Sequence, residues 1–339
     1  MNISFRTRQR LKRTALILLV LALCLSLVGA VWFIWLGRHV IYTRDRGAVL
    51  NMSMSDKFAP GKPAQPVETV PVNIYYNEGE NAINTAAELT QIVGYYADAE
   101  ALQNGVGTVL EQVKTLPAAT PIMIDVKNAK GAFFYSSSVS SKRDSDIDTA
   151  TMDELIAYLD DNHMYAIARL PALRDYEYGL HHVSDGLPTS GGYLWADDDY
   201  CYWLNPASQG TVTYLISIVT ELKALGFDEV VFDNFYFPDT DKIVFNGDKD
   251  QAIASAAKTL MTACATDSFA VSFVGQSATF PLPQGRSRLY LDGTSAAQAD
   301  TLAAQTGLEN PAVNLVFLTK IHDTRFNTYS VLRPLDAAH

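Results

Sequence analysis

Charged side chains close several short apolar runs of the sequence, at points where buried strands would end. Asp125 closes Ile-Met-Ile-Asp, Arg169 closes Tyr-Ala-Ile-Ala-Arg, Asp233 closes Glu-Val-Val-Phe-Asp and Asp292 closes Leu-Tyr-Leu-Asp. Residues two apart on a strand share a face, so Lys127 is expected beside Asp125. One such acid alone is as easily a helix cap. Several carboxyl groups in one partly desolvated hollow have shifted pKa values, and they indicate acid/base chemistry.

The elements that must position these residues alternate between short apolar runs and longer helical patterns. This alternation is typical of a parallel sheet with crossover helices. The predicted strands are 91–96, 122–126, 165–169, 229–233, 270–274, 288–292 and 314–318, with an eighth at either 72–76 or 328–332. The predicted helices are 106–116, 152–162, 211–225, 250–265 and 295–305.

The expected fold is a (β/α)8 TIM-like barrel with an irregular or incomplete last repeat. Roughly 265 residues follow position 72, close to the ~250 that are typical of this barrel. An open, doubly wound sheet is the alternative, but no Gly-rich phosphate loop follows any predicted strand. Gly105 and Gly107 precede a predicted helix without a third glycine in register, so no dinucleotide cofactor is expected.

One uncharged stretch, residues 15–36, is long enough to cross a hydrocarbon core of ~30 Å as a helix. Arg6, Arg8, Arg10, Lys12 and Arg13 precede it, and such an excess of basic residues keeps that end in the cytoplasm. We therefore expect a cytoplasmic tail at 1–14, a single plasma-membrane anchor at 15–36, a Pro-containing stalk at 37–71 and an extracytoplasmic barrel domain at 72–339. A cleaved signal peptide ending at Val28-Gly29-Ala30 is the alternative. The continued apolar run to Leu36 favours the retained anchor.

The charge balance restricts the partners of the exported part. Six basic residues and no acid lie in residues 1–40, which leaves 20 basic against 37 acidic residues and a net charge of −17 beyond that point. Such a surface disfavours nucleic acid and anionic lipid and is compatible with a neutral sugar. Only Cys201 and Cys264 follow the predicted anchor, so no disulfide framework is expected, although one bridge remains open. No Cys/His spacing indicates a metal site.

The long segment 170–205, after the third predicted strand, combines acids with aromatic residues. Aromatic rings stack on the apolar faces of sugars and carboxylates bind hydroxyl groups, so Asp175, Trp195 and Trp203 are expected to contact a glycan. The alternative is that these aromatic side chains fold back onto the barrel as hydrophobic cover. The run from Asp197 to Asp199 lacks the spacing of a calcium loop.

Three blocks carry a resemblance to a known family. They are Pro-Ile-Met-Ile-Asp-Val-Lys-Asn-Ala-Lys-Gly at 121–131, Tyr-Ala-Ile-Ala-Arg-Leu at 165–170 with Arg174-Asp175, and Gly-Phe-Asp-Glu-Val-Val-Phe-Asp-Asn-Phe-Tyr-Phe-Pro at 226–238. Together with Trp203-Leu-Asn-Pro206, they resemble a glycoside hydrolase family of bacterial envelope TIM barrels, related to the α-amylase-like and lipoprotein-type glycosidases. The resemblance implies that Asp125 and Asp233 line a sugar site, with Asp233 as the catalytic carboxylate of the fourth strand.

Two departures from the family pattern bear on activity. Tyr236 stands where the family usually has Arg, and the fifth strand, at 269–275, ends without the acid that related glycosidases use as proton donor. Hydrolysis requires two carboxyl groups, so the partner of Asp233 is expected to be Asp125, Asp292 or an acid of the long loop. The residues expected to bind substrate are Lys127, Arg169, Asp175, Trp195, Trp203, Asn234 and Tyr236.

The sequence thus predicts a membrane-anchored glycoside hydrolase acting on a cell-envelope or extracellular polysaccharide, with no metal or other cofactor. A non-catalytic glycan-binding or scaffold protein on a degenerate barrel is the main alternative, and the missing fifth-strand acid favours it. A third reading is an envelope assembly factor that docks protein partners through its anionic surface.

Overall fold

The computed structural model describes residues 40–43, 47–50 and 89–335 and divides into two units, Met1–Gly79 and Glu80–His339. In the first unit, β1 (Val40–Thr43) and β2 (Gly47–Leu50) pair as an antiparallel hairpin. The hairpin falls within the segment predicted to be an extended stalk, and it was not predicted. The predicted anchor at 15–36 lies outside the described residues. Within the described ranges, no helix is long and apolar enough to cross a membrane.

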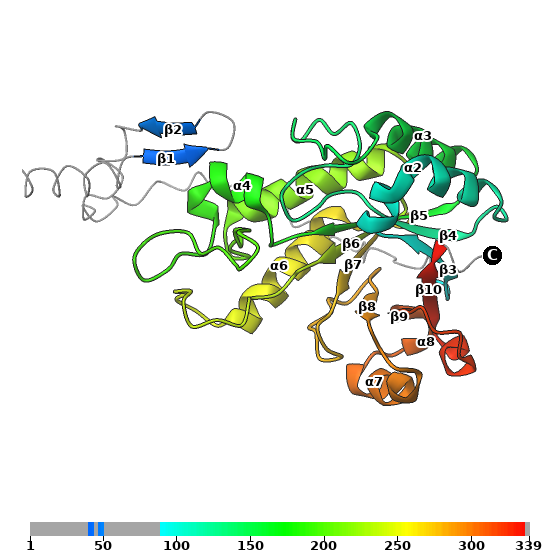
Figure 1. Ribbon diagram of the computed structural model, residues 1–339. Coiled ribbons are helices and arrows are strands. Elements are labelled where there is room, and N and C mark those ends of the chain that lie inside the picture. The colour runs from blue at the N-terminus through cyan, green and yellow to red at the C-terminus, as the bar shows by residue number, and fades with distance from the viewer. Residues whose placement is uncertain (1–39, 44–46, 51–88, 336–339) are drawn as a thin grey trace, which may run out of the picture. The chain divides into compact units, whose positions relative to one another are not determined.

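The second unit is a closed barrel of eight parallel strands, as predicted (Figure 1). Around the barrel the order is β10, β3, β4, β5, β6, β7, β8 and β9. The strands are β3 (Val93–Ala97), β4 (Pro121–Asp125), β5 (Tyr165–Pro171), β6 (Glu229–Asp233), β7 (Ala270–Val274), β8 (Leu289–Asp292), β9 (Leu315–Leu318) and β10 (Ser330–Pro334). Strand β10 pairs with both β9 and β3 and closes the barrel. Of the two candidates for the eighth strand, the C-terminal one is therefore correct.

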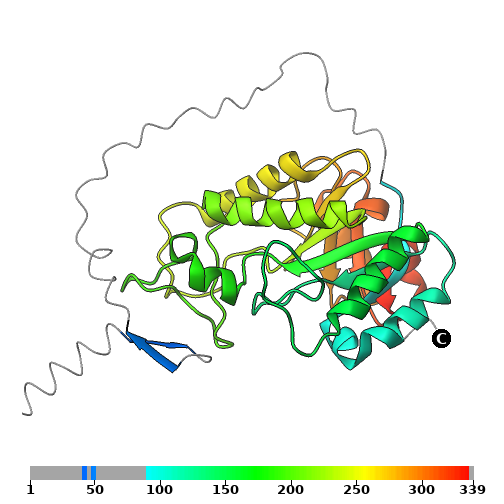
Figure 2. The same cartoon turned by 90° about the horizontal axis from the view of Figure 1, so that it is seen from above.

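Helices cover the outside of the strands, and α5 and α6 lie side by side along it (Figure 2). The α-helices of this unit are α2 (Ala99–Lys114), α3 (Thr149–Asp161), α4 (Tyr176–His181), α5 (Gln209–Ala224), α6 (Lys249–Cys264), α7 (Ala299–Thr306) and α8 (Pro311–Asn314), and the 3-10 helices are η2 (Val183–Asp185), η3 (Ala296–Gln298) and η4 (Thr324–Thr328). Five of the α-helices begin at a side chain that accepts a backbone N–H, namely Asp98, Asp148, Asp175, Ser208 and Asp248. Such caps satisfy donors that would otherwise be unpaired and fix where each helix begins.

Helix α2 begins seven residues earlier than predicted. Gly105 lies inside it with a φ of 147°, outside the helical region, so the helix is kinked there. The predicted helix began only at residue 106, and glycine disfavours helix interiors in general. Burial of Leu102 before the kink and of Val106 after it outweighs that preference.

The second half of the barrel is less regular than the first. In the described chain no helix separates β7 from β8, and only η4 separates β9 from β10. The expected irregularity of the last repeat is therefore confirmed, and it begins earlier than predicted. Cys201 and Cys264 are both buried and free.

The interior of the barrel is packed rather than hollow. Its lining is a single apolar cluster made of Ile92, Tyr96, Met123, Ile167, Val231, Tyr290, Val316, Leu318 and Leu332. Nearer the amino-terminal ends of the strands, Glu229 and Arg288 form a buried ion pair. Tyr290 and Tyr165 donate hydrogen bonds to the same carboxylate at 3.0 and 2.9 Å. This polar plug closes the amino-terminal end, which leaves the opposite rim for chemistry.

Candidate active site at the carboxyl rim of the barrel

Four charged residues lie on the inner face of the barrel at the carboxyl ends of their strands. Met123, Ile167, Val231 and Tyr290 belong to the interior cluster, and each precedes one of the four by two residues. Alternate residues of a strand share a face, so all four charged side chains point inward above that cluster. The expectation that they share one rim is confirmed. They are Asp125, Arg169, Asp233 and Asp292.

Asp125 is bound on both of its carboxylate oxygens. The Nε of Arg169 lies 2.5 Å from Oδ1, and its Nη2 lies 3.0 Å from Oδ2. The backbone N–H of Ala99 also donates to Oδ2, at 2.8 Å, so Asp125 ties the start of α2 to the rim. The two side chains are only 14% and 13% exposed, for Arg169 and Asp125 respectively. A carboxylate held by charged hydrogen bonds on both oxygens has a fixed orientation and can position its neighbours.

Arg169 is the positive centre of the rim. Burial lowers the pKa of its guanidinium, but the carboxylates of Asp125, Asp233 and Asp292 outweigh that effect and raise it overall. Arg169 therefore stays charged and stabilises the negative charge that three acids bring to one site.

Asp233 is mostly enclosed, and burial raises the pKa of its carboxyl group. Arg169 and the backbone N–H of Asn234 act in the opposite direction, and the charges of Asp125 and Asp292 add to the increase. The N–H of Asn234 donates to Oδ1 at 2.6 Å. Asn234 has a φ of 50°, in the left-handed region that Asn tolerates better than most residues, and the chain turns sharply there. A raised carboxyl pKa at this place is the environment of a proton donor.

Asp292 differs from the other two acids because it is exposed to solvent. Its Oδ1 accepts the backbone N–H of Gly293 at 2.6 Å. Gly293 has a φ of 66°, which directs the chain away immediately after the acid. The rim thus holds one acid bound by Arg169, one enclosed acid and one open acid.

Lys127 and Asp175 were expected to contact substrate, and the structure places them elsewhere. Their side chains form an ion pair of 2.7 Å and are both 0% exposed. Tyr214 on α5 also donates to Asp175, at 2.9 Å. Neither side chain therefore has exposed surface that a ligand could contact. The pair instead anchors the loops after β4 and β5 to each other and to α5.

The long loop 170–205 is more ordered than its sequence predicted. It contains α4, η2 and a series of isolated antiparallel bridges, among them Arg174 with Trp203 and Ala196 with Tyr202. Trp203, expected to bind sugar, is only 4% exposed. Its ring lies 5.2 Å from that of Tyr236 and 6.4 Å from that of Trp195. For Trp203 the hydrophobic-cover alternative is correct, whereas Trp195 and Tyr236 keep part of their surface.

The acidic run of this loop has a partner within the protein. Arg174 binds Asp197 at 2.6 Å and Asp199 at 2.5 Å. Burial raises the pKa of Asp197, but the hydrogen bonds from Arg174, the Cys201 backbone and Trp203 lower it overall. In the part of the chain that the structure describes, no group of three or more His, Cys, Asp or Glu side chains is arranged to hold a metal ion.

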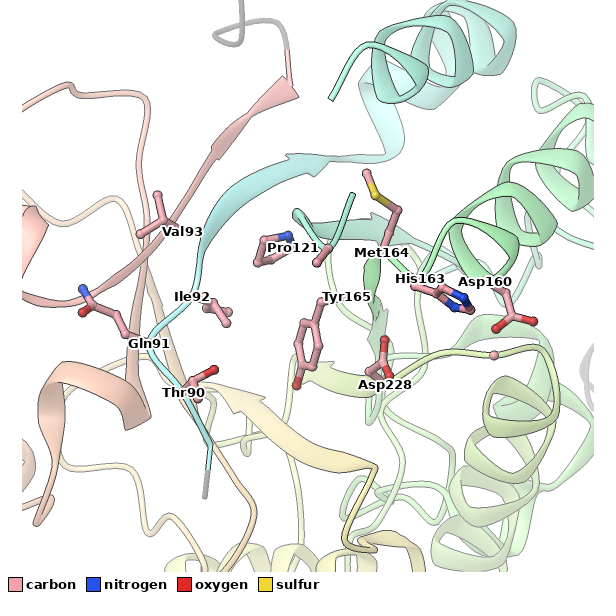
Figure 3. Close-up of a pocket in the computed structure, with 12 residues that line it drawn as sticks. Thr90, Gln91, Ile92, Val93, Pro121, Asp160, His163, Met164, Tyr165 and Asp228 are labelled. Carbon is pink, nitrogen blue, oxygen red and sulfur yellow. The ribbon is translucent and has the colours of Figure 1, made fainter. Parts of the chain in front are cut away.

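A cavity of about 480 Å³ lies at the opposite end of the barrel (Figure 3). Pro121 and Tyr165 are the first residues of β4 and β5, and Asp228 precedes β6. All three line this cavity, together with Asp160 and His163. It is therefore separated from the carboxyl rim by the packed interior and by the Glu229–Arg288 pair.

Sequence reasoning missed that polar plug, although a signal for it was present. Glu229, Val231 and Asp233 alternate along β6, so the argument that directs Asp233 inward also directs Glu229 inward. Arg288 alternates in the same way with Tyr290 and Asp292 in the predicted strand 288–292, and only its pairing with Glu229 depends on the closure of the barrel.

The comparisons with known proteins give one family match and several structures of similar fold. A family described as "Putative glycosyl hydrolase domain" matches residues 96–275. No curated protein matches the chain. A hypothetical protein from Ruminiclostridium thermocellum is similar at 20% identity over 53% of this chain and 96% of its own, with a TM-score of 0.45.

Two enzymes of known name are also similar in structure. An α-galactosidase from Lactobacillus brevis is 11% identical over 74% of this chain and 38% of its own, with a TM-score of 0.50. A GH20 exo-β-N-acetylglucosaminidase from Vibrio harveyi is 9% identical over 72% of this chain and 50% of its own, with a TM-score of 0.48. The chain thus spans half or less of the length of these two enzymes. At these identities, the likeness to the α-galactosidase bears on the fold alone.

Proposed function

This chain belongs to the glycosyl hydrolase domain family that it matches over residues 96–275, and we propose that it hydrolyses glycosidic bonds in a cell-envelope or extracellular polysaccharide. The observation that carries the proposal is the carboxyl rim, where three inward-facing acids surround Arg169. Water and hydroxyl-rich substrates can reach Asp292, while Asp233 is enclosed enough to have a raised pKa. Two acids in different environments are what glycoside hydrolysis requires.

Asp233 and Asp292 are the working pair in this proposal. The carboxyl group of Asp233 donates its proton to the glycosidic oxygen as the bond from that oxygen to the anomeric carbon breaks. In one route, the carboxylate of Asp292 attacks the anomeric carbon and forms a glycosyl ester, which water then hydrolyses as Asp233 takes the proton from that water. In the other route, Asp292 takes a proton from the water that attacks the anomeric carbon directly. The first route retains the anomeric configuration and the second inverts it, so NMR of the first-formed product distinguishes them.

Asp125 is assigned a positioning role because Arg169 and Ala99 already bind both of its oxygens. Arg169 in turn holds positive charge beside Asp233 and Asp292. Both residues act on the reaction through the geometry and charge of the other two acids.

A non-catalytic glycan-binding protein is the second candidate, and a specific feature favours it. Strand β7 ends at Val274 and is followed by Gly275, so the fifth strand of the barrel provides no acid. In this case the rim binds the hydroxyl groups of a sugar and does not hydrolyse its glycosidic bonds.

The test is to incubate the purified barrel domain with soluble neutral polysaccharides and to measure both new reducing ends and retention in affinity electrophoresis. The enzyme proposal predicts release of reducing ends from at least one polysaccharide that also retards the protein. Retardation with no release supports the binding protein instead. Neither release nor retardation contradicts both.

We further propose that the domain is held on the outer face of the plasma membrane by residues 15–36. The support is the uncharged stretch and the basic residues that precede it. Full-length protein should sediment with membranes and keep its N-terminus. Mature protein that begins at Val31 contradicts the anchor and indicates signal-peptide cleavage.

A further inference from the structure

A groove of about 350 Å³ lies beside the carboxyl rim, between the loops that follow β6 and β7. Its first wall is the segment 235–239, which begins two residues after Asp233. Its second wall is formed by residues 276–281, directly after β7, and its edge by the first turns of α6. Because β6 and β7 are neighbours in the barrel, both walls stand on the rim that carries the acids.

The groove lies beside the strand ends that carry Asp233 and Asp292. Strand β7 lies between β6, which ends at Asp233, and β8, which ends at Asp292. The strand without an acid therefore separates the two strands that have one. Gly275 lets the chain turn tightly there, because a Cβ at this position would lie 2.7 Å from Leu289 Cδ1 and 2.9 Å from Ser277 O.

Aromatic rings form the walls, and each is supported by a second ring. Tyr236 packs on Trp203 at 5.2 Å and Phe237 on Phe245 at 4.8 Å. The third wall ring, Phe280, stacks on the buried Phe273 at 5.3 Å. The three wall residues are half-buried. Rings fixed in this way lose little conformational entropy when a ligand stacks on them.

Polar groups stand at the edge of the aromatic surface. Gln276, Asp239 and Asp250 are exposed, and none of the described residues forms a hydrogen bond or an ion pair with their side chains. The ammonium group of Lys249 lies over the ring of Phe237 at 5.6 Å. Apolar walls with a few free amide and carboxylate groups match a pyranose ring, which has an apolar face and a hydroxyl edge. The volume also falls within the ~300–1,000 Å³ of small-ligand sites.

We propose that this groove is a sugar subsite. It takes the pyranose ring on the leaving-group side of the glycosidic bond that Asp233 and Asp292 cleave. The inference rests on the proposed glycoside hydrolase function, and it adds that the substrate extends past the cleaved bond over the β6 and β7 loops. Stacking on Tyr236, Phe237 and Phe280 provides affinity, and Gln276, Asp239 and Asp250 bind hydroxyl groups.

Saturation-transfer NMR with methyl α- and β-D-glucopyranoside, methyl α- and β-D-galactopyranoside and methyl N-acetyl-β-D-glucosaminide tests the subsite directly. At least one of these probes should receive saturation from the wild-type protein. Phe280→Ala should weaken that binding about tenfold, the upper range for one aromatic contact. Because Phe280 also packs on the core, Thr279→Trp provides a second variant, which fills the groove from an exposed position.

Tyr193→Ala is the matched control, since it removes an aromatic side chain that is 68% exposed and outside the groove. It should bind as the wild type does. No saturation of any probe, or binding that survives in both Phe280→Ala and Thr279→Trp, overturns the subsite. Failure of the proposed function has a different signature, namely unchanged turnover in Asp233→Asn whatever the NMR result.

Discussion

Arg169 and Asp125 are Cα partners across β5 and β4, and two hydrogen bonds of 2.5 and 3.0 Å join their side chains. The register of the two strands brings a guanidinium and a carboxylate to the same inward face. A slip of one residue would direct one of them outward. Arg169 also interacts electrostatically with Asp233 and Asp292. The position of Arg169, held by Asp125, therefore decides where the positive charge of the rim lies.

Removal of the Arg169 charge should alter the titration of Asp233. Arg169 lowers the pKa of that carboxyl group, against the increase caused by burial. In Arg169→Met the opposing effect is gone, so the pKa of Asp233 should rise further. The limb of the pH–activity profile that reports Asp233 should then move to higher pH. Carboxyl ¹³C NMR titration measures the pKa of Asp233 directly. Arg169→Lys keeps the charge and serves as the control, and a downward shift in Arg169→Met would contradict the assignment.

Asp233→Asn should raise the melting temperature near neutral pH. The folded pKa of Asp233 is raised above the unfolded value, so ionisation weakens the fold. This penalty is fully present above the folded pKa and disappears as the pH falls below the unfolded value. The advantage of the Asn variant should therefore shrink on acidification, which thermal denaturation across a pH series detects. A melting temperature below that of the wild type at neutral pH would indicate instead that Asp233 holds the loop after β6.

The Lys127–Asp175 pair should matter for stability rather than for ligand affinity. Both side chains are 0% exposed, and loss of one partner from a buried pair costs about 3–5 kcal/mol. Urea denaturation of Lys127→Met should show a loss of this size. The surface pair of Arg325 and Asp323 provides the control, since Arg325→Met should change stability little. Equal stability of the two variants would contradict the structural role of Lys127.

Glu229 and Asp233 share one face of β6 and should respond differently to removal of their charge. Glu229→Gln leaves the buried Arg288 without its counter-charge, at a cost of about 3–5 kcal/mol. Its folded fraction should retain turnover, since Glu229 lies at the plugged end of the barrel. Denaturation and activity measured on the same preparation test this. Lost turnover without lost stability would show that Glu229 belongs to the site.

The rim could be predicted from sequence because it depends on local rules. Asp125, Asp233 and Asp292 each end an apolar run, and parallel strands place such ends on one rim. The alternation of strand residues then directs all of them inward. Element types depend on periodicity in the same way, and so the barrel was predicted correctly.

Pairing and burial could not be predicted in this way because they depend on contacts between distant segments. Lys127 has the same sequence signal as Asp125, yet only the approach of Asp175 from the next loop decides that it is buried. The enclosure of Trp203 similarly depends on Tyr236, which follows a different strand. The groove beside Phe280 arises from two loops whose shapes have no periodic pattern.

The central claim is that Asp233 and Asp292 together cleave a glycosidic bond. The most direct measurement is the rate of reducing-end release from a polysaccharide that binds the domain, by the wild type, Asp233→Asn, Asp292→Asn and the double variant. Each single change should reduce the rate by several orders of magnitude while the protein stays folded, and the double variant should be little worse than either, because the two residues act as one unit. Release at the wild-type rate by folded Asp233→Asn would contradict the account.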